Sequence, residues 1–164
     1  MKITFVRAGL LLALSLGFAS GAEAQSSKLA FEGDIVRGDQ EGAPGPGCVL
    51  NSQFKHLEKV VWRLRILDAN GKPLDDKALK SLIVELPDGQ KMAARFSGHP
   101  PPRLGPVVDH FWTARWIIPA EYPSGSFYYK VVATNLDDST QTWEPFKSLT
   151  SRLTVLDGAI EIKK

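Results

Sequence analysis

Cysteine is nearly absent from this chain of 164 residues, which contains only Cys48. No disulfide can therefore form within the chain, and there is no Cys-x-x-Cys pair for dithiol chemistry or Cys-x-x-Cys-His motif for covalent haem attachment. A single cysteine is a small buried hydrophobe, a bridge to another molecule or a metal ligand. Because free cysteine is among the most buried residue types, we expect Cys48 to pack between sheets, with the other two roles as alternatives.

Long apolar runs are absent except near the N-terminus. Lys2 and Arg7 precede an apolar run over residues 8–19, and Ala22-Glu23-Ala24 follows as a small-x-small sequence. This order is typical of a secretory signal peptide, and the run is shorter than the roughly 20 residues that span a bilayer. We therefore expect residues 1–24 to be a signal peptide, with an uncleaved anchor as the alternative. The mature chain is expected to be periplasmic or secreted, without membrane insertion.

An excess of charge of one sign is also missing. The whole chain has 20 basic and 18 acidic residues. Without Lys2, Arg7 and Glu23 of the leader, 18 basic and 17 acidic residues remain. These charges are interspersed, so no basic block predicts nucleic acid as a partner. The remaining length suits one domain, which we place at residues 25–164 with its core over about 29–157.

The apolar residues do not recur with the period of a helix. Instead, apolar and polar residues alternate along the chain. In VVWRLRIL, residues 60–67, every second side chain from Val60 to Ile66 is apolar, which is the period of a half-buried strand. Turn sequences such as Asn70-Gly71 recur along the chain at intervals of about 8 to 12 residues. This pattern predicts an all-β fold, an antiparallel β-sandwich of about seven to eight strands.

The segment IIPAEYPSGSFYYKVVATNLDDST, residues 117–140, resembles the late strands of bacterial immunoglobulin-like domains of the fibronectin type. The resemblance extends in pattern over residues 60–156 and implies an immunoglobulin-like sandwich in an exported protein. Such domains occur in adhesins, enzyme accessory modules and periplasmic carriers, so the resemblance implies a fold and no single activity. The antibody-type disulfide is absent, and Trp116 and Tyr129 are the candidate core aromatics in its place.

Three exported families with a similar sandwich have signatures that this chain lacks. Copper carriers and copper monooxygenases use a histidine at the mature N-terminus, whereas the first histidine here is His56. Carriers of the sulfur-oxidation type hold substrate on a C-terminal cysteine, whereas this tail reads GAIEIKK. Blue-copper domains place Cys, His and Met close together near the C-terminus, and Cys48 lies too early for that spacing.

Patterns for hydrolytic catalysis are lacking as well. The sequence has no Gly-x-Ser-x-Gly nucleophile elbow, and the acid pairs Asp75-Asp76 and Asp137-Asp138 fall in predicted turns. No nucleophile, base and orienting acid can be assembled from the remaining residues. We therefore assign no catalytic residue and no cofactor, and expect a protein that is not an enzyme.

The histidines define a candidate metal site. His99 and His110 flank a proline-rich stretch between two strands that would be neighbours, so both rings can approach one metal with Asp109 or Cys48 as a third ligand. The alternative, which we favour, places His99 in a solvent-facing loop and aims His110 at the rim of the core, where a main-chain carbonyl satisfies it. His56 lies in a polar segment and is expected to be exposed.

Aromatic residues supply the candidate binding surface. Three of them fall on strand faces opposite the predicted core: Phe111, Tyr128 and Trp143. The first functional hypothesis is therefore an exported, non-catalytic binding or accessory module for a protein or glycan partner in the cell envelope. The alternative is a periplasmic metal (copper) or redox carrier built on the three candidate ligands His99, His110 and Cys48.

Overall fold

The computed structural model describes residues 28–100 and 105–163, so the predicted signal peptide, residues 1–24, lies outside the described residues. Within these ranges the chain forms twelve β-strands and one short 3₁₀ helix, η2 (Leu149–Ser151), and no α-helix. The all-β class expected from the alternating sequence pattern is confirmed. None of the described residues forms a helix long and apolar enough to cross a membrane.

The larger sheet has five strands in the order β2-β1-β4-β8-β7, and every neighbouring pair in it is antiparallel. Its members are β1 (Ala30–Arg37), β2 (Val49–Leu50), β4 (Lys59–Leu67), β7 (Arg95–His99) and β8 (Asp109–Ile117). Along β4 the side chains alternate between buried and half-buried, as the sequence predicts. One face of this sheet therefore packs on the core and the other is its outer face.

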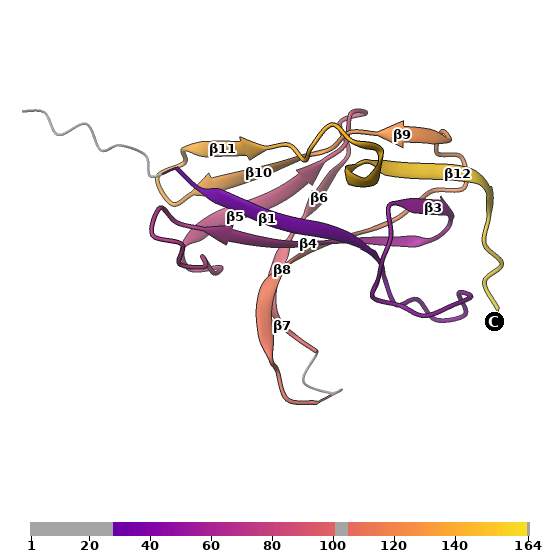
Figure 1. Cartoon of the computed structure of the whole chain (residues 1–164), viewed down its shortest axis with the longest axis horizontal. Helices are drawn as coiled ribbons and strands as arrows, with labels where there is room; N and C mark the ends of the chain where they lie inside the picture. The colour runs from indigo at the N-terminus through magenta and orange to yellow at the C-terminus, as the bar shows by residue number, and fades with distance from the viewer. Residues whose placement is uncertain (1–27, 101–104, 164) are drawn as a thin grey trace, which may run out of the picture.

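Two smaller sheets complete the described fold. The four-stranded sheet has the order β11-β10-β5-β6, and the three-stranded sheet the order β3-β12-β9. Their members are β3 (Gln53–His56), β5 (Leu79–Glu85), β6 (Lys91–Ala93), β9 (Gly125–Phe127), β10 (Lys130–Asn135), β11 (Thr140–Trp143) and β12 (Leu153–Ala159). In Figure 1, β9, β10, β11 and β12 run along one long side of the body, and the β7–β8 hairpin extends away from it.

The structure differs from the expected antiparallel sandwich in two respects. The strand count is higher than seven or eight because residues 49–56 add the short strands β2 and β3 and because two longer runs divide. At Ala94 the chain leaves β6, which pairs with β5, and enters β7, which pairs with β8. Residues 125–135 likewise divide into β9 and β10, which belong to different sheets. In addition, β12 pairs with β3 in parallel, so the sheets are mostly but not entirely antiparallel.

The core lies between the sheets and is built from the alternating positions. Trp62 of β4 is fully buried, and its ring meets that of Tyr129 edge-on, with centroids 5.8 Å apart and planes at 67°. Tyr129 is buried as expected, whereas Trp116 is half-buried and packs edge-on against Tyr122 at 4.8 Å. Trp62, placed in the middle of the longest alternating run, is therefore the central aromatic residue of the core.

Truncation of Trp62 tests this arrangement. We expect Trp62→Ala to lower the free energy of unfolding by about 3–5 kcal/mol, because it removes a fully buried aromatic side chain and leaves a cavity. Val61→Ala, on the half-buried outer face next to it, should cost only about 1 kcal/mol. Urea unfolding followed by tryptophan fluorescence and circular dichroism measures both; equal losses would contradict the assignment of the two faces.

Candidate functional site

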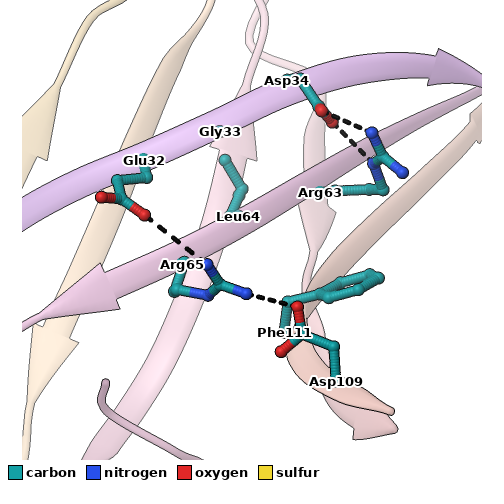
Figure 2. A pocket seen from close by; sticks show the side chains of 8 residues that line it. All are labelled: Glu32, Gly33, Asp34, Arg63, Leu64, Arg65, Asp109 and Phe111. Atoms are coloured by element: carbon teal, nitrogen blue, oxygen red, sulfur yellow. Dashed lines mark hydrogen bonds and ion pairs between the residues drawn. The ribbon is translucent and has the colours of Figure 1, made fainter. Parts of the chain in front are cut away.

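The outer face of the five-stranded sheet carries a row of charged side chains. Figure 2 shows the hollow of about 370 Å³ that they form with residues of β1, β4 and β8. Arg63 donates hydrogen bonds from Nε and Nη2 to the two carboxylate oxygens of Asp34, at 2.7 and 2.5 Å. Arg65 forms an ion pair with Asp109 and lies 3.8 Å from Glu32.

These ion pairs follow directly from strand register. Asp34 lies opposite Arg63 and Glu32 opposite Arg65 in the β1–β4 ladder. The side chains are partly exposed, so each pair stabilises the fold by at most about 1 kcal/mol. Their stronger effect is on register, because a slip of one residue would turn these charges toward the core.

The charge pairing limits what this hollow can do chemically. Its acidic groups already form ion pairs with guanidinium groups, and its lining includes no serine, threonine, cysteine or histidine. Across the described residues, no group of three or more His, Cys, Asp or Glu side chains is arranged to hold a metal ion. The hollow is therefore an ion-paired surface that fixes register, and we assign it no reaction.

The structure does not bring His99 and His110 together. In the β7–β8 hairpin Gly98 lies opposite His110, and His99 lies opposite Asp109, so the two imidazoles project from opposite faces. The His99 ring packs against Phe111 at 5.3 Å on the outer face, and the His110 ring packs against Phe96 at 5.9 Å on the other. His110 has the predicted strand parity but is exposed, because this hairpin extends beyond the body of the sandwich (Figure 1).

Cys48 is exposed, so the prediction that it packs between sheets is wrong. It ends the glycine-rich loop with φ of 59°, in the left-handed region, and its main-chain N–H donates to the Arg37 carbonyl at 2.6 Å. This turn leads into β2, a two-residue strand with exposed side chains, so no second layer covers the thiol. Cys48 and His99 both line a cavity of about 410 Å³ on the outer face of the five-stranded sheet.

His56 is buried, with 8% of its surface exposed, so the prediction that it is exposed is also wrong. Its ring lies between two main-chain carbonyls: Nε2 is 2.7 Å from the Tyr122 oxygen and Nδ1 is 3.0 Å from the Gly158 oxygen. Both carbonyls only accept, so both ring nitrogens donate when the imidazole is protonated. These two hydrogen bonds, that to Tyr122 first, raise the pKa of His56 above its ordinary 6.5.

The three aromatic candidates lie in separate hollows and do not form one patch. Phe111 is half-buried on the outer face of the five-stranded sheet. Tyr128 is exposed, and the Arg152 guanidinium lies 4.2 Å from its ring centroid and donates to its hydroxyl. Trp143, at the end of β11, is half-buried and stacks on Phe31 of β1 with centroids 6.2 Å apart.

Trp143 lines a groove of about 510 Å³ between β1 and β11. Its apolar lining comes from β1, β2 and β11 and from the segments just before β10 and after β11: Phe31, Ile35, Leu50, Tyr129, Trp143 and Phe146. Phe146 is 88% exposed and Leu50 is 66% exposed. Sequence reasoning missed both residues, because neither lies in an alternating run that marks one side of a strand.

The edge of β1 beside this groove has, within the part of the chain that the structure describes, a neighbouring strand only at Val36 and Arg37. The main-chain N–H of Asn51 donates to the Ile35 carbonyl at 3.1 Å, on the side of β1 where β2 pairs with only two residues. Main-chain groups of alternate residues in a strand point the same way, so those of Phe31 and Gly33 also point to this side. Among the described residues, no strand pairs with β1 there.

Gly33 allows β1 to lie close to β4, on the side of β1 opposite the open edge. A Cβ at this position would lie 2.6 Å from Leu64 Cδ2 and 3.0 Å from the Arg63 carbonyl oxygen. Just before β1, the N–H of Leu29 donates to the Gln141 side-chain carbonyl at 2.8 Å, which links the start of β1 to β11. The groove therefore has a fixed span at one end and an open strand edge along one side.

Comparison of the sequence with protein-family models gives no match, and comparison with curated proteins gives none either.

The buried imidazole predicts a dependence of stability on pH. Because the pKa of His56 is higher in the folded chain than its ordinary 6.5, protonated His56 stabilises the fold fully below about pH 6.5. This contribution is lost as the pH rises through the folded pKa. We expect the free energy of unfolding of the wild type to fall over this window and that of His56→Gln to change less. Urea unfolding from pH 5.5 to pH 8.5 measures both; parallel curves for the two proteins would contradict the assignment.

Proposed function

We propose that this chain is an exported, non-catalytic binding module with an immunoglobulin-like sandwich, and that its partner is a protein segment held in the groove between β1 and β11. The observation that carries the proposal is the open edge of β1 beside exposed apolar side chains. Export is proposed from the N-terminal leader pattern, and the immunoglobulin-like assignment from the resemblance in residues 117–140.

An open strand edge favours an extended peptide as the partner. Unpaired N–H and C=O groups along β1 can pair with another chain, and proteins ordinarily cover or shorten such edges. Binding by strand addition uses main-chain hydrogen bonds for affinity and pockets for alternate side chains for specificity. Here the main-chain groups of Phe31 and Gly33 would supply the hydrogen bonds. The apolar groove in front of Trp143 would supply the pocket for the partner's side chains.

The exposed apolar residues support the same proposal. Phe146 and Leu50 lie on the lining of one groove and are mostly exposed, and a clustered apolar surface of this kind marks interaction sites on soluble proteins. A glycan partner is less well supported, because the sequence-predicted aromatic side chains lie in three separate hollows and provide no shared stacking platform. We therefore propose a protein partner rather than a glycan.

Site-specific photocrosslinking in the producing cell identifies the partner segment. A photoreactive amino acid at position 146 should capture a discrete protein, and the cross-linked peptide should be an extended segment with apolar residues at alternate positions. The same group at position 108 is the control, because Val108 is 80% exposed and Phe146 is 88% exposed, but Val108 lies outside the groove.

A synthetic copy of the cross-linked segment then tests whether the groove binds it. We expect Trp143→Ala to weaken binding of that peptide about tenfold or more, because it removes a large aromatic side chain from the groove. Tyr128→Ala is the matched aromatic control, since Tyr128 lines a different hollow, and it should leave affinity unchanged. Equal crosslinking at both positions, or equal effects of the two substitutions, would contradict the proposal.

A further inference from the structure

The cavity of about 410 Å³ on the outer face of the five-stranded sheet has an unusual balance of charge. Three cationic side chains line it, Lys59, Arg63 and Arg115, and Asp39 is the one carboxylate in its described lining. This balance differs from that of the neighbouring hollow in Figure 2, where each arginine has a carboxylate partner.

Strand register brings the three cations close together. In the β4–β8 ladder Arg115 lies opposite Val61, and its diagonal neighbours along β4 are Lys59 and Arg63. Diagonal neighbours in an antiparallel pair are about 7–8 Å apart, within reach of long side chains. The positions of β8 opposite Arg63 and Lys59 hold Thr113 and Ile117, which carry no charge.

Two of these cations have no carboxylate partner among the residues that the structure describes. Arg63 is held by Asp34, but the Lys59 ammonium donates to the main-chain carbonyl of Asp39 at 2.5 Å and forms no ion pair among the described residues. Arg115 is exposed and likewise has no ion pair in the described part of the chain. A bound anion would relieve the repulsion between these neighbouring charges and accept hydrogen bonds from them.

The rest of the lining is apolar enough to hold an organic group. Val36, Val61 and Phe111 contribute apolar side chains, and the Phe111 ring is supported by the His99 ring at 5.3 Å. The volume lies at the lower end of the range of about 300–1,000 Å³ found for small-molecule sites, which combine an apolar lining with a few polar groups.

We propose that this cavity binds a small organic anion, a carboxylate or phosphate group carried on an apolar body. Arg115 and Lys59 bind the anionic group, beside Thr113, which lies opposite Arg63, and the apolar body lies against Phe111 and Val61. This site lies on the outer face of the sheet, apart from the groove of the proposed function, and does not depend on it.

Titration of the mature chain with matched small probes, followed by amide chemical shifts, tests the proposal. Phenyl phosphate and phenylacetate carry both parts of the expected ligand, inorganic phosphate carries only the charge, and benzyl alcohol only the ring. We expect saturable shifts at Phe111, Thr113 and Arg115 with the two aromatic anions, at concentrations where the other two probes give none. Whichever anion binds more tightly identifies phosphate or carboxylate as the preferred group.

Substitutions separate a specific site from general charge attraction. Arg115→Gln should weaken binding about tenfold, because it removes a charged donor from the cavity. Lys77→Gln makes the same change of net charge in the exposed turn after Asp75 and should leave affinity within twofold. Equal effects of the two substitutions, or shifts that do not saturate, would overturn the proposal.

The thiol of Cys48 provides a second measurement that needs no assigned spectrum. Cys48 is exposed and lines this cavity, so its alkylation by iodoacetamide should slow several-fold when phenyl phosphate is bound. The protection should be lost in Arg115→Gln and retained in Lys77→Gln. Unchanged alkylation in a solution that gives saturated chemical shifts would place the anion elsewhere and would overturn the assignment to this cavity.

Discussion

The pairing of β1 with β4 is the constraint on which both proposed surfaces depend. On the outer face its register places Asp34 opposite Arg63 and Glu32 opposite Arg65, and on the core face it places Ile35 opposite Trp62. A shift of one residue would bury the acidic side chains and expose Phe31 and Ile35, so charge and hydrophobicity select the same register. That register also decides which main-chain groups of β1 face away from β4.

Two separate surfaces follow from this one pairing. Toward β11, the open edge of β1 and the apolar side chains that line it and β11 form the groove. On the outer face, Asp34 and Asp109 pair with Arg63 and Arg65, whereas Lys59 and Arg115 form no ion pair within residues 28–100 and 105–163 and lie next to apolar side chains. The two surfaces suit different ligands, an extended peptide in one case and a small anion in the other.

Local pattern was sufficient to predict the all-β class and strand β4, but not where runs divide or which distant strands come into contact. The alternation in residues 60–67 predicted β4 and its buried face correctly, because that pattern is contained within one strand. The burial of His56 depends on Gly158, 102 residues away, and on Tyr122. The alternation of Phe54 and His56 in β3 was the one local signal for it.

The dependence on distant contacts and on backbone geometry also explains why the predictions for Cys48, His99 and His110 differ from the structure. The exposure of Cys48 depends on the backbone turn that ends its loop, where φ is 59°, and burial statistics for cysteine cannot indicate it. The opposite facing of His99 and His110 depends on the hairpin register, which pairs His99 with Asp109. Had the chain paired His99 with His110, the two rings would share one face.

The most direct test of the account is amide hydrogen exchange along β1 in the isolated mature protein. Open-edge geometry predicts that the amides of Phe31 and Gly33 exchange rapidly, whereas those of Glu32 and Asp34, which pair with β4, are strongly protected. Equal, strong protection of all four amides would show that another segment or a second copy already covers the edge. That result would contradict the claim that β1 offers a free edge to a partner.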